Sequence, residues 1–226
     1  MERRRTELLL RLRSAFILIV IALLATYASV YSFAALITLF LAAMAWEWGR
    51  LVRGGGLDIA FMLQTVATVT ACWITAFGHV YYAILTVVAG AAAVFLYRVI
   101  LHVQSKARWS ATGVLYSGLP VIALIWLRTD ADYGWFAILY LFAVVWTTDS
   151  AAYMFGRWIG GVKLAPRISP GKTWAGLIGG ALSAGAISAI FGMSLHGASI
   201  GRLVLLGITF AVVAQLGDLA ESALKR

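Results

Sequence analysis

The stretch GWFAILYLFAVVWTTDSAAYMF, from Gly134 to Phe155, decides the fold of this chain. It is almost wholly apolar and close to the roughly 20 residues that a helix needs to cross a bilayer. Its only charged residue is Asp149. An acid within a bilayer-spanning helix costs at least about 2.5–3.5 kcal/mol and is treated as functional by default. The stretch therefore predicts a membrane helix that carries a functional acid toward its C-terminal end.

The composition of the whole chain agrees with a membrane protein. Of its 226 residues, 62% are hydrophobic and 12% are charged, whereas a soluble domain has about 45–50% apolar and about 25% charged residues. The single cysteine, Cys72, cannot pair within the chain, which excludes a disulfide framework and a zinc cluster. The net charge of +9 comes from bases scattered over short loops, so we expect no nucleic-acid partner.

Apolar segments of membrane-spanning length recur along the chain. We expect spans at approximately Ser14 to Ser29, Val30 to Trp48, Leu57 to Phe77, Val80 to Leu101, Ser110 to Leu127, Gly134 to Phe155, Thr173 to Met193, and Leu203 to Leu224. The predicted fold class is an all-α, polytopic integral membrane protein with about eight transmembrane helices. We expect one transmembrane domain, residues 1–226, in which helices within 1–133 are scaffold and those within 134–226 carry the site.

The distribution of lysine and arginine predicts the orientation of these helices. With the N-terminus in the cytoplasm, only Arg128 and Arg202 of the 18 basic residues fall on the far side. This is a strong positive-inside bias. It predicts a cytoplasmic N-terminus and places both the segment that follows Asp149 and the C-terminal end of the chain on the cytoplasmic side.

Polar residues gather on one face of the last predicted helix. Asp218, Glu221, Ser222 and Lys225 stand at i, i+3, i+4 and i+7, so they share a face. Two carboxylates and a hydroxyl are hard oxygen ligands of the kind that magnesium takes. Alternatively, this is only a helix end at which Lys225 and Arg226 reach the interface and pair with the acids. The residues alone leave both interpretations open.

A second polar segment, Gly156 to Lys172, follows Asp149. It is predicted to be a loop, bent by glycine and proline, with these polar side chains: Arg157, Lys163, Arg167, Ser169 and Lys172. Backbone N–H groups in such a loop and the start of the following helix favour phosphate. Alternatively, Asp149 pairs with Arg157 or another loop base, and the bases only enforce the topology.

Together, the two polar segments would place a divalent cation beside phosphate-binding bases. This combination points to phosphoryl or nucleotidyl transfer on a lipid.

Three other classes of function compete with a transferase that acts on one particular lipid phosphate. Acids within the membrane also serve ion-coupled carriers, although a carrier would place them near the midplane of two matching halves. An enzyme for another lipid phosphate and an inactive scaffold are the other two.

Gly176 and Gly180, four residues apart, permit close contact between helices, which leaves a homodimer open.

Three blocks of sequence resemble a known family. They are Asp149-Ser-Ala-Ala-Tyr153 with Gly156-Arg157, Ser169-Pro-Gly-Lys-Thr-Trp174 with Gly176, and Gln215-x-Gly-Asp-x-x-Glu-Ser-x-x-Lys-Arg226. In this order and spacing they are similar to bacterial phosphatidate cytidylyltransferase, also called CDP-diacylglycerol synthase. The family signature continues beyond Arg226 with further acids and a final span. We therefore expect this sequence to lack part of the metal site and to be inactive alone.

The resemblance implies the reaction of CTP with phosphatidic acid to give CDP-diacylglycerol and pyrophosphate, in the cell inner (plasma) membrane with the active site facing the cytoplasm. It implies magnesium, with a second cation left open, and membrane lipids as partners. The implied metal ligands are Asp149 and Asp218. The implied catalytic residues are Asp149, Lys172, Asp218, Glu221, Ser222, Lys225 and Arg226. The implied substrate-binding residues are Arg157, Arg167, Ser169, Lys172, Ser222, Lys225 and Arg226.

Overall fold

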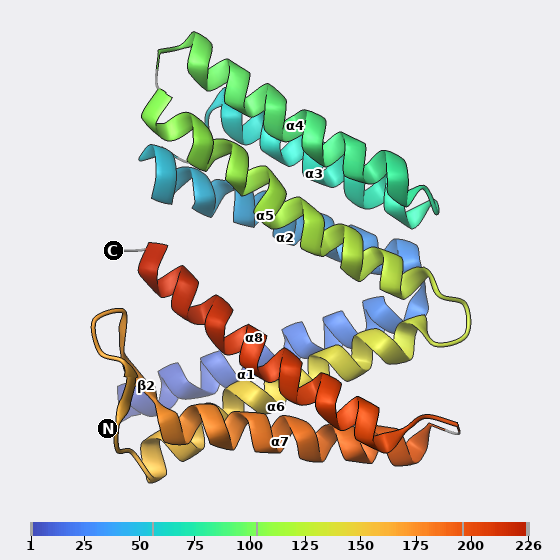
Figure 1. Ribbon diagram of the computed structural model, residues 1–226, viewed down its shortest axis with the longest axis vertical. Coiled ribbons are helices and arrows are strands. Elements are labelled where there is room, and N and C mark those ends of the chain that lie inside the picture. The colour runs from blue at the N-terminus through green and yellow to red at the C-terminus, as the bar shows by residue number, and fades with distance from the viewer. Residues whose placement is uncertain (1, 56, 103, 196, 225–226) are drawn as a thin grey trace. The chain divides into compact units, whose positions relative to one another are not determined.

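A computed structural model describes residues 2–55, 57–102, 104–195 and 197–224 (Figure 1). The chain forms two compact units, Met1–Ile138 and Leu139–Arg226. The boundary falls inside a helix, a few residues after the expected division at 133/134 between scaffold and site-bearing helices. Each unit is described by itself.

The described residues fold into eight helices and one small hairpin. The helices are α1 (Glu2–Ala28), α2 (Val30–Arg53), α3 (Ile59–Ala76), α4 (Val80–Ile100), α5 (Gln104–Thr129), α6 (Gly134–Trp158), α7 (Trp174–Ser194) and α8 (Ile200–Leu224). Among the residues described, seven helices are long and apolar enough to cross a membrane, and the apolar part of α1, Arg13–Ala28, is shorter. The predicted fold class, an α-helical polytopic membrane protein, is confirmed.

The N-terminal unit is an antiparallel packing of α2 to α5 with small side chains at its contacts. Its core includes Ala67, Ala71 and Ala91 from α3 and α4, which let these helices approach closely. The helix ends follow from the sequence. Ser29 caps α2 in a reciprocal capping box with Ser32, and Asp58 caps α3 by accepting a hydrogen bond from the backbone of Phe61.

The C-terminal unit contains a β-hairpin where a loop was predicted from the sequence. Strand β1 (Lys163–Ala165) pairs antiparallel with β2 (Ser169–Thr173), with Lys163 opposite Thr173 and Ala165 opposite Ser169. Pro170 obscured this strand because proline removes a ladder hydrogen bond. It is tolerated here because both strands of a two-stranded sheet are edges. The hairpin leads directly into α7, whose N-cap is Thr173.

Two glycines of α7 are used for packing within this unit. A Cβ on Gly176 would lie 2.7 Å from the carbonyl oxygen of Ala152, and one on Gly180 would lie 3.1 Å from that of Thr148. Both carbonyl groups belong to α6. The pair that suggested a homodimer therefore brings α7 against α6 of the same chain.

Gly176→Ala is expected to lower the free energy of unfolding by about 1–3 kcal/mol, the usual cost of overpacking. The added methyl group would meet a backbone carbonyl, so α7 must shift away from α6. Thermal unfolding in detergent measures the loss. Gly201→Ala in α8 is the matched control, because a Cβ there would meet no other atom of the described chain within 4 Å. Equal stability of the two variants would contradict the packing role of Gly176.

Candidate active site

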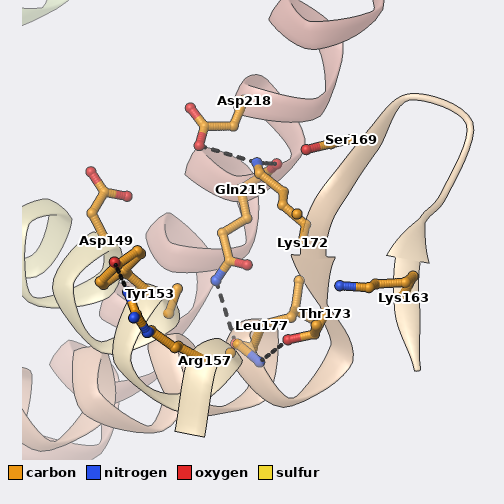
Figure 2. Close-up of a pocket in the computed structure, with 14 residues that line it drawn as sticks. Asp149, Tyr153, Arg157, Lys163, Ser169, Lys172, Thr173, Leu177, Gln215 and Asp218 are labelled. Atoms are coloured by element: carbon orange, nitrogen blue, oxygen red, sulfur yellow. Dashed lines mark hydrogen bonds and ion pairs between the residues drawn. The ribbon is translucent and has the colours of Figure 1, made fainter. Parts of the chain in front are cut away.

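A pocket of about 590 Å³ opens in the C-terminal unit among α6, the hairpin, α7 and α8. Figure 2 shows that its polar side chains come from separate elements: Asp149 from α6, Lys172 from β2 and Asp218 from α8. Of the sequence-predicted site residues, these line the pocket: Asp149, Arg157, Ser169, Lys172 and Asp218. Its volume lies within the range of ordinary ligand pockets. The structure thus brings residues of all three sequence blocks to one place.

Lys172 connects the hairpin to α8. Its Nζ lies 3.1 Å from Oδ2 of Asp218 and donates a hydrogen bond of 3.2 Å to the backbone oxygen of Gln215. The exposed fractions of the two side chains are 23% for Lys172 and 59% for Asp218. An ion pair this open to solvent adds little to stability. The contact therefore matters more for the charge that it places in the pocket than for the fold.

Asp149 completes a group of three charges. It interacts electrostatically with both Asp218, which repels it, and Lys172, which attracts it. One ammonium group, in contact with Asp218, thus serves two carboxylates from different helices. This arrangement favours binding of a further cation, which would relieve the repulsion between the acids.

The donor set fits magnesium. Asp149 and Asp218 offer hard carboxylate oxygens, and magnesium in proteins is often held by one or two carboxylates together with water and substrate phosphates. Across residues 2–55, 57–102, 104–195 and 197–224, no cluster of three or more histidine, cysteine, aspartate or glutamate side chains forms a closed metal cage. Substrate oxygens would have to complete the coordination, as they do in nucleotide-dependent enzymes.

Basic side chains line the rest of the pocket. Arg157, Lys163 and Lys172 supply three positive charges against the two acids. Arg157 donates a hydrogen bond of 2.9 Å from Nη1 to the hydroxyl of Tyr153, and both side chains are exposed (Figure 2). This is the contact that the structure gives for Arg157, in place of the expected alternative of a pair with Asp149. The guanidinium and ammonium groups can contact a polyphosphate.

Two residues that organise the pocket were not predicted to have a role in it. Gln215 is 6% exposed, and its amide nitrogen lies 3.4 Å from the backbone oxygen of Leu177 while its own backbone oxygen accepts from Lys172. Thr173 is buried, and its hydroxyl accepts a hydrogen bond of 3.1 Å from the backbone of Gly176. Both left signals in the sequence: Gln215 stands three residues before Asp218 on one helix face, and a threonine before an apolar helix is a typical N-cap.

Other predicted site residues lie elsewhere. Within the part of the chain that the structure describes, Arg167, Glu221 and Ser222 are not among the residues that line this pocket. Arg167 lies in the turn between β1 and β2, and Glu221 and Ser222 lie near the C-terminal end of α8. Lys225 and Arg226 are outside the described residues. The roles that the resemblance implies for these five residues stay predictions.

The sequence matches the model of a known protein family. A model described as the cytidylyltransferase family matches residues 9–226. The chain belongs to the cytidylyltransferase family. The resemblance found from the three sequence blocks is therefore confirmed.

Curated relatives carry the same kind of name. The chain is 45% identical over 123 residues to a phosphatidate cytidylyltransferase of Brucella suis, covering 54% of this chain and 46% of that protein. It is 48% identical over 124 residues to one of Brucella melitensis, with the same coverage. A phosphatidate cytidylyltransferase of Rickettsia bellii is 35% identical over 130 residues, covering 54% of this chain and 56% of that protein. The chain spans about half the length of the curated relatives it matches.

Proposed function

We propose that this chain carries the phosphate-binding site of a phosphatidate cytidylyltransferase. The reaction joins CTP and phosphatidic acid to give CDP-diacylglycerol and pyrophosphate. The observation that carries the proposal is the contact of Lys172 with Asp218, beside Asp149, in a pocket of a membrane-spanning unit. Membership of the cytidylyltransferase family and the names of the relatives support it.

The chemistry asks for positioning of two polyanions more than for a strong base. A phosphate oxygen of phosphatidic acid attacks the α-phosphorus of CTP, a new P–O–P bond forms, and the bond to the β-phosphate breaks to release pyrophosphate. The attacking phosphate is already an anion at neutral pH. Arg157, Lys163 and Lys172 would hold the phosphates close to one another and offset their charge. Magnesium, held by Asp149 and Asp218, would supply further charge neutralisation when bound.

A groove of about 450 Å³ supports a lipid substrate. It runs along the same two helices, α6 and α7, and is lined mostly by apolar side chains, including Phe155, Ile159, Ile178 and Leu182. Phe155 immediately precedes Gly156, which lines the polar pocket. We propose that an acyl chain lies in this groove while the phosphate of the lipid enters the pocket.

The proposal includes the location of the enzyme. The chain is an integral membrane protein, and we propose the inner (plasma) membrane with the pocket on the cytoplasmic side. The positive-inside distribution of bases supports this side. CTP is a cytoplasmic nucleotide, so a pocket on this side receives both substrates, one from solution and one from the bilayer.

Pyrophosphate release tests the proposal. Purified protein in detergent is supplied with CTP, phosphatidic acid and magnesium, and the assay is run on this chain and on one extended with the C-terminal segment of the family. Release that requires all three components, from the extended chain at least, is the expected result. Release with a polyprenyl phosphate but not with phosphatidic acid would assign another lipid phosphate. Folded protein that releases none with any lipid phosphate would contradict a transferase.

A further inference from the structure

A buried arginine in the N-terminal unit has fewer partners than its donors require. Arg53, the last residue of α2, has a side chain that is 2% exposed, and its Nε lies 3.0 Å from Oδ2 of Asp58. Its two terminal nitrogens, Nη1 and Nη2, are buried without a hydrogen-bond partner among the described residues. A guanidinium group has five N–H donors. Leaving charged donors unpaired in the interior is costly.

Two further bases adjoin Arg53. Arg98, near the end of α4, repels Arg53 electrostatically, and its Nε is also buried without a partner in the described chain. Lys106, near the start of α5, donates from Nζ to the backbone oxygen of Arg53 at 3.4 Å. We call Arg53, Asp58, Arg98 and Lys106 the Arg53 cluster. It contains three positive charges and one negative charge, so it attracts an anion.

The ends of four helices bring the residues of the Arg53 cluster together. In the N-terminal unit, α2 and α4 end on the same side on which α3 and α5 begin (Figure 1). Asp58 also caps α3 through a hydrogen bond of 2.8 Å from the backbone of Phe61, so its carboxylate is shared. A Cβ on Gly49 would collide with Nη2 of Arg53. Gly49, one turn before Arg53 on α2, therefore leaves space for the guanidinium group.

Two neutral polar groups lie toward the same ends of their helices. The side-chain amide of Gln64 and the hydroxyl of Ser110 are buried without hydrogen-bond partners among the residues described. They occupy the second turn of α3 and of α5, respectively. Buried polar groups are nearly always satisfied by protein or by a bound species. Unsatisfied donors near all four helix ends in this part of the unit thus indicate that something is bound there.

We propose that the Arg53 cluster is a second anion site, which binds a phosphate group. A guanidinium group matches the geometry of phosphate through paired N–H donors. The excess positive charge of the cluster suits a doubly or singly charged phosphate. None of its residues lines the pocket of the C-terminal unit. The phosphate comes either from the headgroup of an anionic phospholipid or from free phosphate in solution.

Binding is tested on the whole chain in a Lys172→Gln background, which weakens the other phosphate-binding pocket. Native mass spectrometry from detergent counts bound phosphatidylglycerol, with diacylglycerol as the lipid without phosphate. In parallel, the apparent melting temperature is titrated with sodium phosphate and with sodium chloride at matched ionic strength. Adducts of phosphatidylglycerol alone would assign a lipid headgroup, and stabilisation by inorganic phosphate alone would assign free phosphate. Binding of neither would overturn the proposal.

Variants connect the binding to this cluster. Arg98→Gln keeps the pair of Arg53 with Asp58 and is expected to weaken binding about tenfold or more, since a charged hydrogen bond is lost. Arg50→Gln is the matched control, because it also removes one positive charge. Arg50 lies one turn before Arg53 on α2, and its side chain is exposed over Trp46. Its expected effect is less than about twofold. Equal weakening by both variants would overturn the proposal.

Asp58→Asn gives a prediction of opposite sign. Asparagine retains the cap of α3 but removes the acid that competes for Arg53. Binding of the phosphate group is expected to become several-fold tighter. A cluster that is only a structural ion pair would instead lose stability and show no change in phosphate or lipid binding.

Discussion

Asp218→Asn is expected to lower the rate of pyrophosphate release by at least about 100-fold, a loss typical of removing one preorganised charged group from an active site. Asparagine has nearly the same size but lacks the negative charge that holds Lys172 at 3.1 Å and that would bind magnesium. The rate is measured with saturating CTP and phosphatidic acid in the chain extended with the family's C-terminal segment. Folding should be nearly unaffected, because the side chain of Asp218 is 59% exposed.

Asp132→Asn is the matched control for this experiment. It is the same chemical change at an exposed turn before α6, outside the pocket, and it is expected to leave the rate unchanged. If the Asp218 variant kept half of its activity while well folded, Asp218 would have no role in holding a metal. Loss of activity in both variants would point to a general effect of charge on the preparation.

The helices could be predicted from the sequence because membrane spanning imposes a length and a composition on each one. The stretch from Gly134 to Phe155 was expected as one span, and α6 runs from Gly134 to Trp158. The expected division between the first two spans, between Ser29 and Val30, also exists: α1 ends at Ala28 and α2 begins at Val30. There the physical cause is local, since Ser29 and Ser32 cap each other and end the continuity between α1 and α2.

The site could be predicted only in part. Helical periodicity shows on which face of a helix a residue lies, but it does not show whether the residue reaches the pocket. Asp218, Glu221 and Ser222 share a face, yet of these only Asp218 lines the pocket among the described residues. The contact between Lys172 and Asp218 joins residues 46 positions apart. It depends on the hairpin, whose proline and glycine conceal its strands in the sequence. Similarly, the pairing of Arg53 with Asp58 depends on where α3 begins.

Lys172→Met is expected to have the second large effect, in two measurements that move in opposite directions. Loss of the ammonium group removes a charge that would bind the phosphates of CTP, so kcat/KM for CTP should fall about 100-fold. The same change leaves Asp149 and Asp218 facing each other without a positive neighbour from Lys172. The affinity for a divalent cation should therefore rise, as measured by titration with manganese observed by electron paramagnetic resonance.

The opposed signs separate a catalytic role of Lys172 from a structural one. If Lys172 only held the hairpin against α8 through Gln215 and Asp218, its loss would disorder the pocket and weaken both CTP and the cation. Lys172→Arg is the conservative control, because it keeps the positive charge and should retain weak cation binding with part of the CTP turnover. In the proposed role, the ammonium group of Lys172 lies beside the two carboxylates before substrate binds, where a metal ion lies during the reaction. A methionine variant that bound manganese more weakly than the unsubstituted protein would contradict this role.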